Sequence, residues 1–268
     1  MSVVRHIAVN VFKESVRDKV LYNLVVFAVL LISTSYLLGQ LTAGQDMKII
    51  KDLGLASISI FGLLIAVFIG IGLVWKEVEK RSIYALLSKP MGRGEFILGK
   101  YCGLVLTLLI NVGIMTIAYY AVLAYLGWTA DPVTRTSWPA PPTDPAMLEA
   151  IALIIVELML VTAIALFFST FSSPFLSAML TTGLWVIGHF NDDLRNLGAV
   201  TGSPAAASVA RGLYYVLPNF SAFDVKAQVV HGQPVEASYV ALTTMYGIVY
   251  LALVLVGAVA IFSRKDFK

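Results

Sequence analysis

The most suggestive spacing of chemical groups lies in residues 94–101. Gly94, Gly99 and Lys100 reproduce most of the phosphate-binding pattern G-x-x-x-x-G-K-[ST]. The next residue is Tyr101, whereas the pattern needs a small hydroxyl there to hold magnesium and a preceding strand to present backbone amides. We therefore predict that this chain binds no nucleotide, carries no cofactor and is not an enzyme.

Two polar residues fall inside long apolar stretches. Glu157 lies eight positions after Glu149, about 12 Å deeper along a helix. An ionisable group at such depth in a membrane by default indicates a transport pathway or a gate. The alternatives are a protonated carboxyl group or a hydrogen bond to a neighbouring helix. Asn111 is a weaker candidate for the pathway, because a buried amide more often holds helices together.

A polar cluster follows another apolar stretch, at His189, Asn191, Asp192 and Asp193. Histidine and aspartate can ligate a metal, but the outer ends of membrane helices are ordinarily polar. The three histidines form no H-E-x-x-H pattern, and Cys102 is the only cysteine. We therefore predict neither a metal site nor an intrachain disulfide.

The composition places these residues in a membrane protein. Of the 268 residues, 59% are hydrophobic and 13% are charged, whereas a soluble domain has roughly 25% charged residues. The net charge of +3 is small and clusters beside the apolar blocks. This charge pattern is typical of membrane topology and not of nucleic-acid binding.

Six apolar blocks are long enough to cross a membrane as helices. Helices satisfy their own backbone hydrogen bonds, which a spanning segment must do. The sequence therefore predicts an all-α, multi-pass protein with one domain over residues 1–268. The predicted helices are residues 20–39, 53–75, 104–128, 149–172, 174–190 and 239–262.

Lysine and arginine define the orientation, because they are retained on the cytoplasmic side. Thirteen of the 19 fall on one set of connections and six on the other, which predicts that both termini are cytoplasmic. In residues 1–19, Val4, Ile7 and Val11 recur at helical spacing with the basic residues largely elsewhere. This segment predicts an amphipathic helix on the inner membrane surface; the alternative is a solvated helical tail.

The connections differ in character. The proline-rich residues 131–145 predict an extended outer loop. Ser172 and Ser173 can cap a helix that begins at Pro174, which predicts a tight inner turn. Residues 191–238 form the longest outer connection, and we expect a re-entrant or interfacial element there.

Residues 76–103 predict a helix-turn-helix bracket at the inner face. The second helix would be interrupted near Pro90, and Glu95 would open a short helix leading through Lys100 into the third span. The alternative is a solvated loop. The bracket contains Glu77-x-Glu79-x-Arg81, then residues 86–90 (LLSKP) and residues 93–100 (RGEFILGK).

At these residues the sequence resembles the type-2 ABC permease family, which includes exporters of type V architecture and permeases associated with multicopper-enzyme maturation. The resemblance implies a homodimer or pseudodimer of permeases in the bacterial cytoplasmic membrane. Two separate ATPase subunits would carry ATP and magnesium, an outer accessory protein could join them, and membrane lipid would surround the spans. The transported substrate and the direction of transport are not indicated.

The resemblance also implies that the bracket forms the coupling helix that contacts the ATPase. The residues expected at that contact are Glu77, Glu79, Arg81, Arg93, Glu95, Phe96, Ile97, Lys100 and Ser173. Phe96 or Ile97 would fill a pocket on the partner. The rival interpretations are an autonomous secondary transporter, a membrane scaffold and, least favoured, an intramembrane enzyme.

Overall fold

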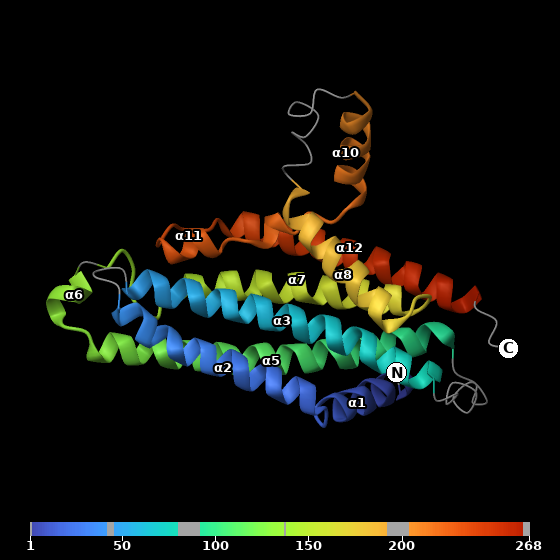
Figure 1. The fold of residues 1–268 in the computed structure, drawn as a ribbon, viewed down its shortest axis with the longest axis horizontal. Helices are drawn as coiled ribbons and strands as arrows, with labels where there is room; N and C mark the ends of the chain where they lie inside the picture. The colour runs from blue at the N-terminus through green and yellow to red at the C-terminus, as the bar shows by residue number, and fades with distance from the viewer. Residues whose placement is uncertain (1, 42–45, 80–91, 137, 192–203, 265–268) are drawn as a thin grey trace.

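The protein is an all-helical bundle in the computed structural model, which describes residues 2–41, 46–79, 92–136, 138–191 and 204–264 (Figure 1). No strand occurs in these ranges, so the predicted all-α class is confirmed. The long helices are α2 (Lys19–Gln40), α3 (Asp46–Glu79), α5 (Arg93–Thr129), α7 (Ala146–Ser169) and α12 (Ala237–Arg264). The shorter ones are α1 (Ser2–Ser15), α6 (Pro132–Thr136), α8 (Pro174–His189), α10 (Pro204–Val216), η1 (Ser221–Phe223) and α11 (Lys226–Val230).

Within the described ranges, five helices are long and apolar enough to cross a membrane, namely α2, α3, α5, α7 and α12. The sixth predicted span corresponds to α8, which has 16 residues. At about 1.5 Å per residue it is about 24 Å long, shorter than the roughly 30 Å hydrocarbon core. The prediction of six spans is therefore not confirmed, because α8 is too short to cross the hydrocarbon core alone.

The helices α3 and α7 form the centre of the bundle. In each of these two helices, 67% of the residues in the most apolar stretch are buried, whereas in α12 the buried share of that stretch is 22%. Small residues of α3 allow this packing: a Cβ atom at Gly62 would lie 2.4 Å from Leu158 of α7, and one at Gly70 would lie 2.7 Å from Ala165. Without water to drive apolar surfaces together, such close backbone approach is a main source of helix association in membranes.

The bracket predicted for residues 76–103 is only partly described. One uninterrupted helix, α5, runs from Arg93 to Thr129, so there is no separate short helix before the third span. The expectation of a second, separate short helix before the third span is therefore wrong. Residues 80–91, which include Arg81 and Pro90, lie outside the described ranges.

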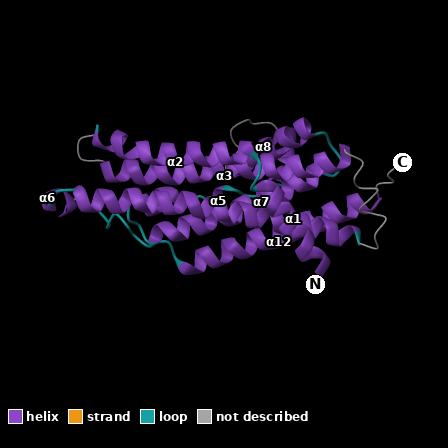
Figure 2. Cartoon of the chain, turned by 90° about the horizontal axis from the view of Figure 1, so that it is seen from below, coloured by secondary structure: helices purple, strands orange, loops and turns teal. Residues whose placement is uncertain are grey.

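The two ends of the bundle gather different elements, and the long helices run side by side between them (Figures 1 and 2). One end holds α6 and the start of α3. The predicted extended loop at residues 131–145 contains this five-residue helix, α6. The other end holds α1, the end of α3, the start of α5, the turn between α7 and α8, and the end of α12.

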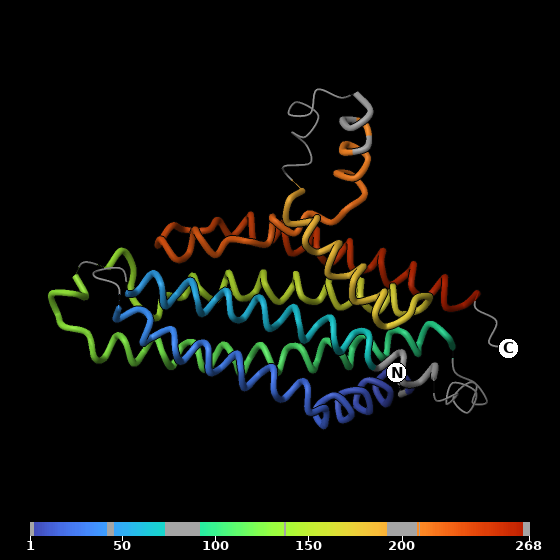
Figure 3. Tube along the Cα trace, viewed as in Figure 1, coloured from blue at the N-terminus to red at the C-terminus, as the bar shows by residue number. Residues whose placement is uncertain are grey.

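The long connection after α8 leaves the bundle and returns to it. The helix α10 projects away from the long helices (Figure 3). The chain then comes back at Phe220, whose backbone N–H donates to the Gly188 carbonyl at 3.0 Å. Phe220, Phe223 and Val229 are fully buried in the main core. Within the predicted connection 191–238, the part that enters the bundle is therefore η1 and α11.

Candidate functional site

The start of α5 is capped by its own sequence. The Gly92 backbone N–H donates to Glu95 Oε2 at 3.2 Å, and the Phe96 N–H donates to the Gly92 carbonyl at 3.2 Å. A glutamate at the third helical position satisfies an otherwise orphaned amide and opposes the positive end of the helix dipole. The side chain of Glu95 is exposed, so this capped turn presents a negative charge at the end of the bundle.

The same turn is fastened to the last helix. Arg93 Nη1 donates to the Ser263 carbonyl at 2.6 Å and lies 3.5 Å from the Phe262 carbonyl. The rings of Phe96 and Phe262 stack with their centroids 5.6 Å apart. Lys100 Nζ lies 4.9 Å from the Phe96 ring centroid, within the range of a cation–π interaction. Arg93 thus joins the start of α5 to the end of α12.

Two residues that the sequence suggested as partner anchors are buried inside this chain. Phe96 is 9% exposed and Ile97 is 0% exposed, and Lys100 is 1% exposed. The expectation that Phe96 or Ile97 fills a pocket on an ATPase is therefore wrong for this arrangement, because both already fill the core beneath α12. On this turn, Glu95 and Leu98 face outward instead.

The N-terminal helix α1 lies against α5. Its packing depends on Gly99 and Gly103: a Cβ atom at Gly103 would lie 2.6 Å from the Ala8 carbonyl oxygen, and one at Gly99 would lie 2.8 Å from Ile7. Val11 is buried, whereas Arg5 and Lys13 are exposed. Sequence reasoning missed this contact, although the G-x-x-x-G spacing of residues 99–103 is the usual signal for close helix approach.

Three of the other predicted contact residues, Ser173, Glu77 and Glu79, belong to elements at the same end. Ser173 caps α8, its Oγ accepting from the Leu176 N–H at 3.4 Å, so the predicted tight turn is confirmed there. Glu77 and Glu79 belong to the last turn of α3, which ends nearby (Figure 1). The side chains of these two glutamates, and the whole of Arg81, lie outside what the structure describes.

A second group of polar side chains surrounds Glu157, near the middle of α7. Glu157 is 2% exposed. Its Oε1 accepts from Trp185 Nε1 of α8 at 2.6 Å and lies 3.6 Å from His189 Nε2. The His189 ring stacks on Phe220 with centroids 5.9 Å apart. The carboxyl group therefore links α7, α8 and the returning segment.

The returning segment also carries an ion pair, between Asp224 and Lys226 at 3.5 Å. Sequence reasoning identified Glu157 and His189 separately but did not connect them or find Trp185. The available signal was the spacing of Trp185 and His189, which lie four residues apart and so on one face of a helix.

Asn111 does not belong to this group. Its Nδ2 donates to the Thr107 carbonyl of its own helix at 2.7 Å, so this hydrogen bond is not the expected bridge between helices. Asn191 is buried, and its Oδ1 has no hydrogen-bond partner within the described part of the chain. Asp192 and Asp193 lie outside it. Among the described residues no three His, Cys, Asp or Glu side chains gather as metal ligands.

The comparison with known families decides the identity. A model described as ABC-2 family transporter protein matches residues 5–267, nearly the whole chain. The chain belongs to the ABC-2 transporter family. No curated protein matches it significantly. The ABC-2 protein is accordingly a multi-pass permease component of an ABC transporter, and such permeases work in general with an ABC ATPase.

Proposed function

We propose that this ABC-2 permease is driven by separate ATPase subunits that bind where α3 ends and α5 begins. The observation that carries the proposal is the exposed, capped turn at Gly92–Glu95, which Arg93 fastens to the end of α12. A partner that moves this turn therefore acts on two long helices at once. Glu95 and Leu98 would supply the contact surface, with Glu77, Glu79 and Arg81 on the preceding segment.

The uninterrupted helix α5 would transmit this movement. With 37 residues it is about 55 Å long, which exceeds the thickness of the hydrocarbon core. ATP-driven closure of the ATPase pair would tilt α5 and α12 together and shift the bundle between two arrangements. The result would be export of a substrate, or transmission of mechanical force across the membrane.

The proposed assembly contains two ATPases, which hold ATP and magnesium, and two permease units as a homodimer or pseudodimer. An outer accessory protein would meet the opposite end of the bundle. We place the permease in the bacterial cytoplasmic membrane with both termini in the cytoplasm, because thirteen of the 19 basic residues lie on that side in this orientation. α1 would lie along the inner surface.

We further infer a sixth passage across the membrane, made jointly by α8, η1 and α11. Gly232, which follows α11, lies beside Pro139 and Ala140 of the loop before α7. The turn between α7 and α8 lies at the opposite end (Figure 1). The chain between them must therefore travel the length of the bundle, although α8 alone is too short to span it.

We propose that Glu157 acts as a gate on the substrate pathway, at the contact between α7 and the sixth passage of the chain. Its hydrogen bond from Trp185 holds α8 against α7, and breaking that bond would release α8 and the returning segment together. A buried ionisable group in a membrane is retained for such a role more often than for stability.

The ATPase contact can be tested by co-purification with an ABC ATPase from the same source. Glu95→Ala combined with Leu98→Ala should reduce the ATPase recovered with the permease by about tenfold, because loss of an apolar anchor typically costs more than 1 kcal/mol. Val133→Ala, an exposed apolar position on α6 at the far end, is the matched control. Unchanged recovery and unchanged coupled ATP hydrolysis in the double variant would refute the proposed contact.

A further inference from the structure

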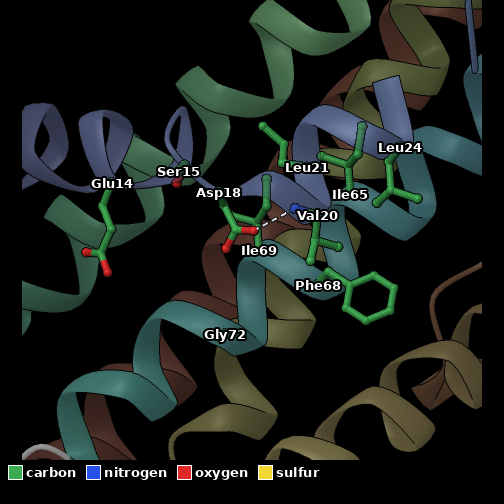
Figure 4. A pocket seen from close by; sticks show the side chains of 10 residues that line it. All are labelled: Glu14, Ser15, Asp18, Val20, Leu21, Leu24, Ile65, Phe68, Ile69 and Gly72. Carbon is green, nitrogen blue, oxygen red and sulfur yellow. Dashed lines mark hydrogen bonds between the residues drawn. The ribbon is translucent and has the colours of Figure 1, made fainter. Parts of the chain in front are cut away.

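A cavity of about 190 Å³ lies where the α1–α2 turn meets α3 (Figure 4). Its walls are apolar and include Leu24 of α2 and Phe68 and Ile69 of α3. Phe68 is 56% exposed, so the cavity continues onto the outer surface of the bundle. An apolar cavity that continues onto the lipid-facing surface of a membrane protein is accessible to an acyl chain from the surrounding bilayer.

The opposite side of the cavity is polar. Glu14, Ser15 and Asp18 line it, and Asp18 also caps α2 by accepting from the Val20 N–H at 2.9 Å. Ser15 is 3% exposed, and its Oγ has no hydrogen-bond partner in the described part of the chain. A buried hydroxyl normally has a partner, so an unpaired one in a cavity wall indicates that a ligand group belongs there.

Charge indicates what kind of group this is. Two carboxylates and a hydroxyl can all accept hydrogen bonds, which suits a primary ammonium with its three donors. The neighbouring cations Arg17 and Lys19 are exposed and do not line the cavity. These two cations could contact a phosphate group of a ligand whose ammonium lies in the cavity.

We propose that this cavity binds a membrane lipid with a primary amine head group, taken from the leaflet beside α1. The ammonium contacts Asp18 and Ser15, the Glu14 carboxylate adds its negative charge at the edge of the cavity, and part of one acyl chain lies against Leu24 and Phe68. Because the cavity touches the α1–α2 turn and α3 together, the bound lipid fixes the angle between them. This site is independent of the ATPase contact proposed above.

The experiment measures lipid binding to the purified full chain in neutral detergent by native mass spectrometry. Phosphatidylethanolamine should bind about tenfold more tightly than phosphatidylglycerol, a difference equivalent to one ionic hydrogen bond. Phosphatidylcholine, whose ammonium has no N–H donor, should resemble phosphatidylglycerol. Glu14→Gln combined with Asp18→Asn should abolish the preference, and the asparagine still caps α2.

A filling variant tests the cavity itself. A Cβ atom at Gly72, which lines the cavity, would meet no described atom within 4 Å, so Gly72→Leu can project into the space without a clash. Gly113→Leu on α5, where space is equally open, is the matched control. Tight phosphatidylethanolamine binding should disappear only in the first variant. Equal binding of the two lipids to the wild-type chain, or equal loss in both leucine variants, would overturn the proposal.

Discussion

The buried carboxyl group of Glu157 has its polar neighbours on another helix, α8. Trp185 donates to it at 2.6 Å, and His189 lies 3.6 Å away. In a region without water, few other hydrogen-bond donors could replace the indole N–H. Removing the indole should therefore lower the free energy of unfolding as well as affect function. The contact is therefore both a structural tie between α7 and α8 and the proposed gate.

Replacing the donor tests this tie. Trp185→Phe keeps most of the ring but removes the N–H, and should lower the free energy of unfolding by about 1–3 kcal/mol in a detergent titration. Trp128→Phe is the matched control, because Trp128 is 80% exposed at the end of α5 and should change stability little. If the free energies of unfolding of the two variants are equal, the Trp185–Glu157 hydrogen bond does not hold α8 in place.

The contact between α1 and α5 depends on the absence of side chains at two glycines. The distances at Gly99 and Gly103 leave no space for a methyl group unless α1 moves away. Since α1 carries the exposed basic residues Arg5 and Lys13, its position on α5 would also determine where those charges meet the membrane surface in the proposed orientation.

A larger residue at Gly103 should therefore displace α1. Spin labels on the natural Cys102 and on Val9→Cys, both exposed, report the α1–α5 distance. In Gly103→Leu this distance should lengthen and its distribution should broaden, because the leucine side chain would overlap the Ala8 carbonyl. Gly113→Leu should leave the distribution unchanged. A distribution identical in both variants would show that α1 does not pack through Gly103.

The course of the chain through the bundle decides its topology. Because α8 alone is too short to span the hydrocarbon core, the number of crossings depends on whether η1 and α11 complete the passage to the far end. The proximity of Gly232 to Pro139 supports the proposed sixth passage. In that proposed topology both termini would lie on one side, as the distribution of basic residues predicts.

Single cysteines in a Cys102→Ala background can test this arrangement in intact cells. An impermeant thiol reagent should label Val133→Cys and Gln233→Cys, which precede α7 and α12 at the far end, and should leave Glu14→Cys and Arg264→Cys unlabelled. All four positions are exposed in the structure. Labelling of Arg264→Cys together with Val133→Cys, but not of Gln233→Cys, would mean that only five helices cross.

The sequence by itself determined the class of protein and most of its helices. Five predicted segments match long helices, because the length and apolarity needed to cross a membrane are local properties of the chain. The capped turn at Ser173 was equally local. The family was also evident from residues 77–100, since a motif is read without knowing how it packs.

Only the tertiary structure decided which faces of those helices meet. In a membrane, an apolar residue can face lipid or protein at similar cost, so the hydrophobic pattern does not show that Phe96 and Ile97 are buried while Leu98 is exposed. Nor could the sequence join Glu157 to Trp185, because their contact depends on how α8 packs across α7. Packing between helices, rather than their formation, determined which residues are available for the candidate gate and for the proposed ATPase contact.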